Sequence, residues 1–236
     1  MSAKVITLQY NDVLVPCDAV PDPTTIAVAA AVAKRLGVPV VLHSIVSSGL
    51  EAVDEFELRR AADNFGADVA VSVTCDDGRP VADQLSDLVS KGRSLLCMCT
   101  GARSTVLRAI VSNVAGTVAG ERQSQLLAVG ARCDAGFTGR RLVIAASPAD
   151  RAADSPWIND ARDFATSAGL ESELVTIAPS DNDESVAEAL VSMGSLADVA
   201  AIAMLTRHTG RFNRLGSTTL RVIRSASCPI LVCADG

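Results

Sequence analysis

Seven cysteines and two histidines are the side chains of this 236-residue chain best suited to metal binding or nucleophilic chemistry. Cys97 and Cys99 stand two positions apart in an apolar run, so both thiols of a strand there would face the same way. Such a pair suits redox chemistry or a metal ion, but the sequence offers no further Cys or His at ligand spacing. We therefore expect the thiols to pack in the core and predict no metal site.

The other candidate binding residues are polar side chains in predicted loops. Arg207, Arg211 and Arg214 could meet a phosphate, although charged loops of this kind are usually just solvated. Gly216 and Ser217 precede a helical pattern, where free N–H groups and a partial positive charge suit an anion. Ser217 could equally be an ordinary N-cap.

Common enzyme motifs are absent from the sequence. We find no phosphate-binding loop of the form Gly-x4-Gly-Lys-Ser/Thr, no Gly-x-Gly-x-x-Gly after the first strand and no Gly-x-Ser-x-Gly elbow. The two histidines leave little room for a catalytic triad or a zinc site. We predict no enzymatic activity and no catalytic residues; a nucleotide hydrolase is disfavoured because no general base is visible.

Composition indicates a compact α/β protein. Apolar residues make up 49% and aromatic residues only 3% of the chain, so the core must be Ala, Val, Leu and Ile, as in parallel sheets under small-residue helices. The net charge of −6 and the lack of a basic run argue against nucleic acid as a partner. Neither a membrane span nor a secretory signal is recognisable, and buried reduced thiols fit the cytoplasm.

Roughly the same unit occurs twice along the chain. The matching segments are 13–15 with 142–144, 98–100 with 204–206, and 124–127 with 228–231. The offset between them shrinks in steps, which indicates a duplicated domain whose second copy lacks about one strand–helix unit. We predict a first domain over 1–134, a linker over 133–139 broken by Gly136 and Gly139, and a shortened second domain over 140–236.

The first half alternates strands and helices. The predicted strands are 13–17, 39–45, 68–74, 94–99 and 124–130. The first helix has Asp22 as candidate N-cap, Pro23 at its first position and Gly37 at its end. Further helical stripes contain Leu58 and Ala62, Val81 and Leu85, and Ile110 and Val114.

The second half has fewer elements. Its predicted strands are 142–146, 173–177, 199–205 and 230–233, and its predicted helices are 156–168, 185–193 and 217–224. This alternation implies two doubly wound parallel sheets, each with the strand order 3-2-1-4-5. The unit missing from the second copy would be an edge strand, which a sheet can lose without opening its middle.

In the order of its strands, helices and short motifs, each half resembles a universal stress protein (Usp) domain. The segments that carry the resemblance are 13–18, 34–37, 41–43, 77–80 and 95–100 in the first half, and 215–218 and 228–232 in the second. They keep the family's order over nearly the whole chain, which is similar to tandem Usp proteins of actinobacteria. The resemblance implies a Rossmann-like fold of the adenine-nucleotide-hydrolase type.

ATP-binding members of the family share an acidic residue after the first strand and a Gly-x2-Gly-x9-Gly-Ser/Thr segment that cradles ribose and phosphates. In the first half the resemblance places Asp18 at the acidic position, Cys99, Ala102 and Ser112 at the glycine positions and Asn113 at the Ser/Thr position. Ser44 completes this candidate set.

In the second half only the last two positions match, at Gly216 and Ser217. Leu205 and His208 replace the first two glycines, and Ser147 replaces the acidic residue. Because neither half has the full set, the resemblance implies degenerate motifs, with ATP or AMP bound weakly if at all and no other cofactor.

Two functions follow as expectations. In the first, the protein is a non-enzymatic stress-response regulator or scaffold that acts on an unidentified protein partner. In the second, the first domain is a weak adenine-nucleotide sensor. We expect the apolar strands 124–130 and 228–233 to pair as an internal pseudodimer, and the uncovered strand 173–177 to favour a homodimer.

Overall fold

A computed structural model describes residues 10–17, 22–44, 55–63, 71–75, 94–99, 125–133, 136–152, 155–177, 183–206 and 217–234. The helices expected around Val81 and Ile110 lie outside these residues.

The first half contains seven described elements: β1 (Asp12–Cys17), α1 (Pro23–Leu36), β2 (Val40–Ser44), α2 (Glu55–Asp63), β3 (Val71–Cys75), β4 (Ser94–Cys99) and β5 (Gln125–Val129). All five predicted strands are present, and β4 has the predicted bounds. The start of α1 is confirmed in detail, since the Asp22 side chain accepts a hydrogen bond from the Thr25 N–H and Pro23 opens the helix. Gly37 ends α1 in the left-handed conformation, with φ of 69°.

In the second half, eight elements are described: β6 (Arg141–Ala146), α5 (Pro148–Ala152), α6 (Pro156–Ser167), β7 (Glu171–Thr176), α7 (Asp183–Gly194), β8 (Val199–Thr206), α8 (Ser217–Ser225) and β9 (Ile230–Ala234). The four predicted strands and three predicted helices are all present to within two residues. The short helix α5 is an addition that the periodicity of the sequence does not predict.

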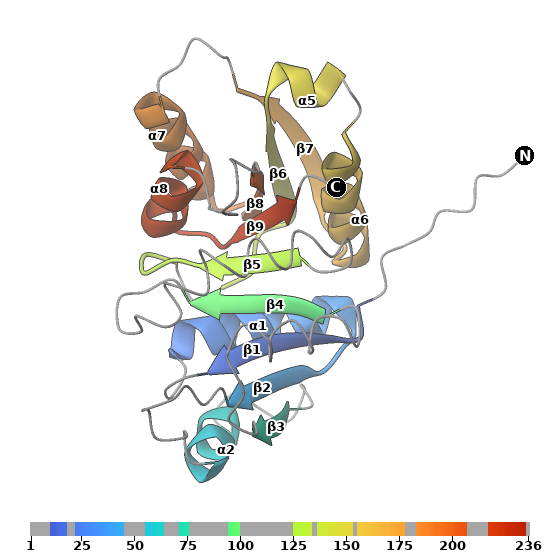
Figure 1. The fold of residues 1–236 in the computed structure, drawn as a ribbon, viewed down its shortest axis with the longest axis vertical. Coiled ribbons are helices and arrows are strands. Elements are labelled where there is room, and N and C mark those ends of the chain that lie inside the picture. The colour runs from blue at the N-terminus through green and yellow to red at the C-terminus, as the bar shows by residue number, and fades with distance from the viewer. Residues whose placement is uncertain are drawn as a thin grey trace, which may run out of the picture.

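The nine strands of the described residues form one sheet with the order β3-β2-β1-β4-β5-β9-β8-β6-β7 (Figure 1). The first five strands follow the order that the sequence predicts for the first half. The remaining four follow the same order without its outermost strand, and β7 takes the edge position. The sheet is therefore α/β and parallel within each half.

The junction between the halves is an antiparallel pair of strands. β5 and β9 pair with Leu126 opposite Val232, Leu127 opposite Leu231 and Ala128 opposite Ile230. All six residues are buried, so the apolar edges that the sequence predicts to meet are covered by each other. Because the junction is antiparallel, the carboxyl ends of the two sets of parallel strands lie at opposite edges of the sheet, as the arrows of β5 and β9 show in Figure 1.

Helices cover both faces of the sheet with separate apolar layers. One layer joins residues of α1, such as Val28 and Val32, with residues of α6, such as Trp157 and Phe164. The other joins residues of α7 and α8, including Leu190 and Ile223, with the opposite face of the strands. The first layer runs through both halves, so the core does not stop at the junction.

The segment that leads into β6 is held by α1. The Arg35 guanidinium donates to the carbonyl oxygens of Thr138 and Gly139, at 3.3 and 2.8 Å, and lies 5.3 Å from the centre of the Phe137 ring. Phe137 in turn makes an edge contact with Phe164 of α6. The part of the predicted linker that the structure describes is thus fixed against both halves.

Candidate functional site

The carboxyl edge of the first half is where a doubly wound sheet usually binds ligands. Cys17 ends β1 and lies opposite Ser44, the last residue of β2, which lies opposite Cys75 at the end of β3. Ser44 is fully buried, and its hydroxyl has no hydrogen-bond partner in the part of the chain that the structure describes. Leaving a buried hydroxyl unpaired costs about 1–3 kcal/mol, which makes Ser44 a candidate for a ligand contact.

A second hydroxyl at this edge has the same property. Thr25 lies in the first turn of α1, is 2% exposed, and its Oγ1 is also unpartnered within the described residues. The backbone of Thr25 is occupied, since its N–H donates to Asp22 at 3.3 Å and its carbonyl accepts from the Cys97 thiol at 3.9 Å. Sequence analysis missed Thr25 because its N-terminal helix position gives no sign of burial.

Thiols near this edge are arranged for packing rather than for chemistry. Burial raises the pKa of Cys97, and the nearby thiols of Cys133 and Cys99 raise it further. Burial also raises the pKa of Cys228 to about 12. A protonated, buried thiol is a poor nucleophile and a poor metal ligand. Among the described residues, no group of three or more His, Cys, Asp or Glu side chains could hold a metal ion.

Three of the predicted nucleotide-contact residues lie in the part of the chain that the structure describes: Ser44 and Cys99 in the first half and Ser217 in the second. Ser44 and Cys99 end β2 and β4 at the carboxyl edge of the first half, where Cys99 is half-buried. Ser217 begins α8 and is exposed. Because α8 follows β8, its first turn lies at the carboxyl ends of the strands of the second half. These ends point in the direction opposite to the carboxyl ends of the first half.

The remaining predicted contacts lie outside the described residues, so the structure does not place them; they are Asp18, Ala102, Ser112, Asn113 and Gly216.

In the second half, Ser147 stands where the family has its acidic residue. Its N–H and its hydroxyl both donate to the Asp150 carboxylate, the former at 3.1 Å, and its Oγ accepts the Asp150 N–H at 3.2 Å. These reciprocal bonds form a capping box that starts α5 directly after β6. The N–H and the side chain of Ser147 therefore both make hydrogen bonds within the first turn of α5.

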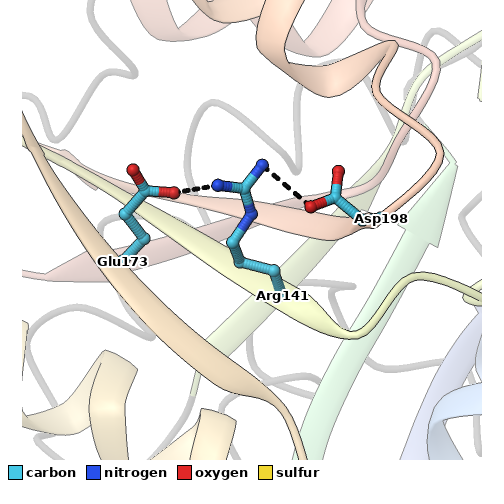
Figure 2. A network of polar contacts seen from close by, with 3 residues as sticks. All are labelled: Arg141, Glu173 and Asp198. Carbon is cyan, nitrogen blue, oxygen red and sulfur yellow. Dashed lines mark hydrogen bonds and ion pairs between the residues drawn. The ribbon is translucent and has the colours of Figure 1, made fainter.

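An ion network lies at the other end of β6, where sequence analysis had placed no functional residue. Figure 2 shows Arg141 between Glu173 of β7 and Asp198, which precedes β8. The guanidinium is 3.1 Å from the Asp198 carboxylate, and the Arg141 N–H donates to the Asp198 carbonyl at 2.9 Å. Both carboxylates are about half exposed, and such pairs are worth about 0–1 kcal/mol each. The network joins the amino-terminal parts of β6 and β7 to the residue before β8, at the end of β6 opposite to Ser147.

These features define the class of the protein as an α/β protein with a mostly parallel, doubly wound sheet. Among the described residues, none of the helices has the length and apolar character of a membrane span. No protein-family model matches the chain, and no curated protein matches its sequence.

Solved structures do match it. A universal stress protein from Archaeoglobus fulgidus is similar with a TM-score of 0.60 at 13% identity, over 97% of this chain and 100% of that chain. A protein assigned to the universal stress proteins from Pseudomonas aeruginosa UCBPP-PA14 is similar with a TM-score of 0.56 at 12% identity, over 97% of this chain and 94% of that one. A functionally unknown protein from Pseudomonas aeruginosa PAO1 has a TM-score of 0.57 at 13% identity, with the same coverage. The chain therefore has the fold of universal stress proteins.

Proposed function

We propose that this protein is a non-enzymatic, universal-stress-type regulator or scaffold of the cytoplasm that works through its surface rather than through a bound nucleotide. The fold supports a stress-response role, because the similar structures include universal stress proteins. In this proposal the halves 1–134 and 140–236 are degenerate Usp-like domains that form an internal pseudodimer through β5 and β9.

The observation that carries the proposal is the capping box of Ser147 and Asp150. Where ATP-binding members of the family have an acidic residue, this chain has Ser147, which starts a helix and donates to the nearby Asp150 carboxylate. In the first half, Cys99 brings a Cβ to a position where glycine would let the backbone approach phosphate. Both changes oppose tight nucleotide binding.

A second candidate function rests on a different observation. The buried, unpartnered hydroxyls of Thr25 and Ser44 at the carboxyl edge of the first half could hydrogen-bond a ligand that the fold places there. The first half would then be a weak sensor of ATP or AMP, while the second half stays empty.

Thermal unfolding with added ATP, ADP and AMP distinguishes the two functions. A nucleotide at 100 times its Kd stabilises the protein by about 2.7 kcal/mol, which corresponds to a rise in Tm of about 5–10 °C at this chain length. The scaffold proposal expects no shift at millimolar nucleotide and no nucleotide released from the purified protein.

The sensor function expects a shift that Ser44→Ala reduces and that the matched change in the other half, Ser217→Ala, leaves intact. A shift of several degrees at micromolar ATP would overturn the scaffold proposal.

A further inference from the structure

The outer edge of β7 is the surface from which we draw a further inference. β7 is a terminal strand of the sheet and pairs along its whole length with β6, from Arg141 opposite Glu171 to Ala146 opposite Thr176 (Figure 1). Within the described residues, β7 has no second strand beside it. Terminal strands with regular backbone can pair with another chain.

The hydrogen bonds to β6 show which backbone groups of β7 point outward. The Glu171 N–H donates to the Arg140 carbonyl at 2.8 Å, and the Ile177 N–H donates to the Ala146 carbonyl at 2.9 Å. In a parallel ladder, alternate residues turn both their N–H and their C=O toward the same neighbour. Glu171, Glu173, Val175 and Ile177 therefore face β6. The backbone groups of Ser172, Leu174 and Thr176 face away from the sheet.

These outward residues are symmetric about Leu174. A twofold axis through Leu174, perpendicular to the sheet, would place Ser172 opposite Thr176 of a second copy and Leu174 opposite Leu174. Every outward N–H and C=O of the strand then finds a partner, as an antiparallel pair requires.

Charge disfavours registers shifted toward the amino end of β7. With Leu174 at the centre, Glu173 lies opposite Val175 of the second copy and Glu171 opposite Ile177. If the axis passed through Ser172 instead, Glu171 would lie opposite Glu173, and like charges directly across an antiparallel pair destabilise it. Moreover, the Glu173 carboxylate is already paired with Arg141 of its own chain (Figure 2).

Side-chain burial on β7 agrees with a partner at this edge. Leu174 packs against one core layer and Val175 and Ile177 against the other, yet all three remain only partly buried. A second copy of β7 would cover them further and join two nine-stranded sheets into one.

We propose that two copies of this chain associate through antiparallel pairing of their β7 strands, with the twofold axis at Leu174. Pairing of one short strand makes a small interface, so we expect a weak dimer that forms in the micromolar range and dissociates on dilution. This association is independent of nucleotide binding, and its test does not depend on the proposed function.

A charge-swap experiment at Leu174 tests both the interface and its register. Sedimentation velocity over a range of protein concentrations should show a monomer–dimer equilibrium for the unchanged chain. Leu174→Lys and Leu174→Glu should each be monomeric, because the introduced charges would meet their own copies at the axis. An equimolar mixture of the two variants should dimerise again, because opposite charges then face each other.

Leu174→Pro provides a second variant that removes an outward N–H without introducing a charge, and the ladder to β6 does not use that N–H. It should keep the native circular dichroism spectrum and lose the dimer. The proposal is overturned if the unchanged chain stays monomeric at high micromolar concentration, if Leu174→Pro still dimerises, or if the mixture of Lys and Glu variants fails to associate.

Discussion

Gly130 follows β5 at the point where the first half meets α8. A Cβ at Gly130 would lie 1.8 Å from the carbonyl oxygen of Ile223 and 3.0 Å from its carbonyl carbon. Since a carbon atom and a carbonyl oxygen do not normally approach closer than about 3.3 Å, Gly130→Ala requires α8 to move by about 1.5 Å relative to β5. Ile223 is 1% exposed and anchors α8 in the core.

Neither backbone at this contact can yield easily. The Gly130 carbonyl accepts the Cys133 N–H at 3.0 Å, which fixes the turn after β5. Overpacking a core commonly costs about 1–3 kcal/mol, and a clash between two backbones belongs at the upper end. We expect Gly130→Ala to lower the free energy of unfolding by about 3 kcal/mol and the Tm by about 6–12 °C.

Fluorescence of the single tryptophan, Trp157, can follow this unfolding, because its side chain is fully buried in α6. Gly136→Ala is the matched control, since its nearest contact would be a side-chain atom of Thr138 at 3.2 Å, which can move aside. The reasoning is refuted if Gly130→Ala loses no more stability than Gly136→Ala.

Three further predictions concern the buried polar groups and the linker. Ser44→Ala should leave the ligand-free protein as stable or up to about 1 kcal/mol more stable in urea unfolding, because it removes an unpaired buried hydroxyl. Burial raises the pKa of Cys97 and Cys228 above that of an unfolded thiol, so the folded state keeps protons that the unfolded chain releases. Below about pH 9 these thiols should not change the free energy of unfolding. Above about pH 9 each thiol should lower it by up to ~1.4 kcal/mol per pH unit, and Cys228→Ala should make this decline less steep. Arg35→Met and Phe137→Leu should each lower stability by about 1–2 kcal/mol, and the double variant should lose less than the sum if the cation–π contact couples them.

Local rules account for the elements that the sequence predicts well. The start and end of α1 follow from Asp22, Pro23 and Gly37 alone, because capping depends on neighbouring backbone groups. The buried strands follow from continuous apolar runs. The helix α5 was missed although its signal was present, since Ser147 and Asp150 have the spacing of a capping box.

Features of the candidate site that depend on register could not be predicted. Arg141 meets Glu173 only because β6 and β7 pair in a particular alignment, and a single sequence does not fix that alignment. Likewise, the missing hydrogen-bond partners of Thr25 and Ser44 result from how α1 and the strands pack together. The division of the chain into domains at 134 and 140 stays a prediction, as do the nucleotide contacts.

β7 differs from β2, the strand at the corresponding place in the other half, in lacking a second neighbour among the described strands. Both strands pair with the first strand of their half, but β2 also pairs with β3 and is almost wholly buried. β7 has no such second neighbour among the described strands, and Glu171, Ser172 and Glu173 are exposed. Charged residues at an edge oppose indiscriminate pairing. Because both glutamates lie in the amino-terminal half of β7, they oppose pairing at that end and leave the register centred on Leu174 free of like-charge contacts. The sequence of β7 thus resists alignments that bring its amino-terminal half against itself and leaves the register centred on Leu174 open.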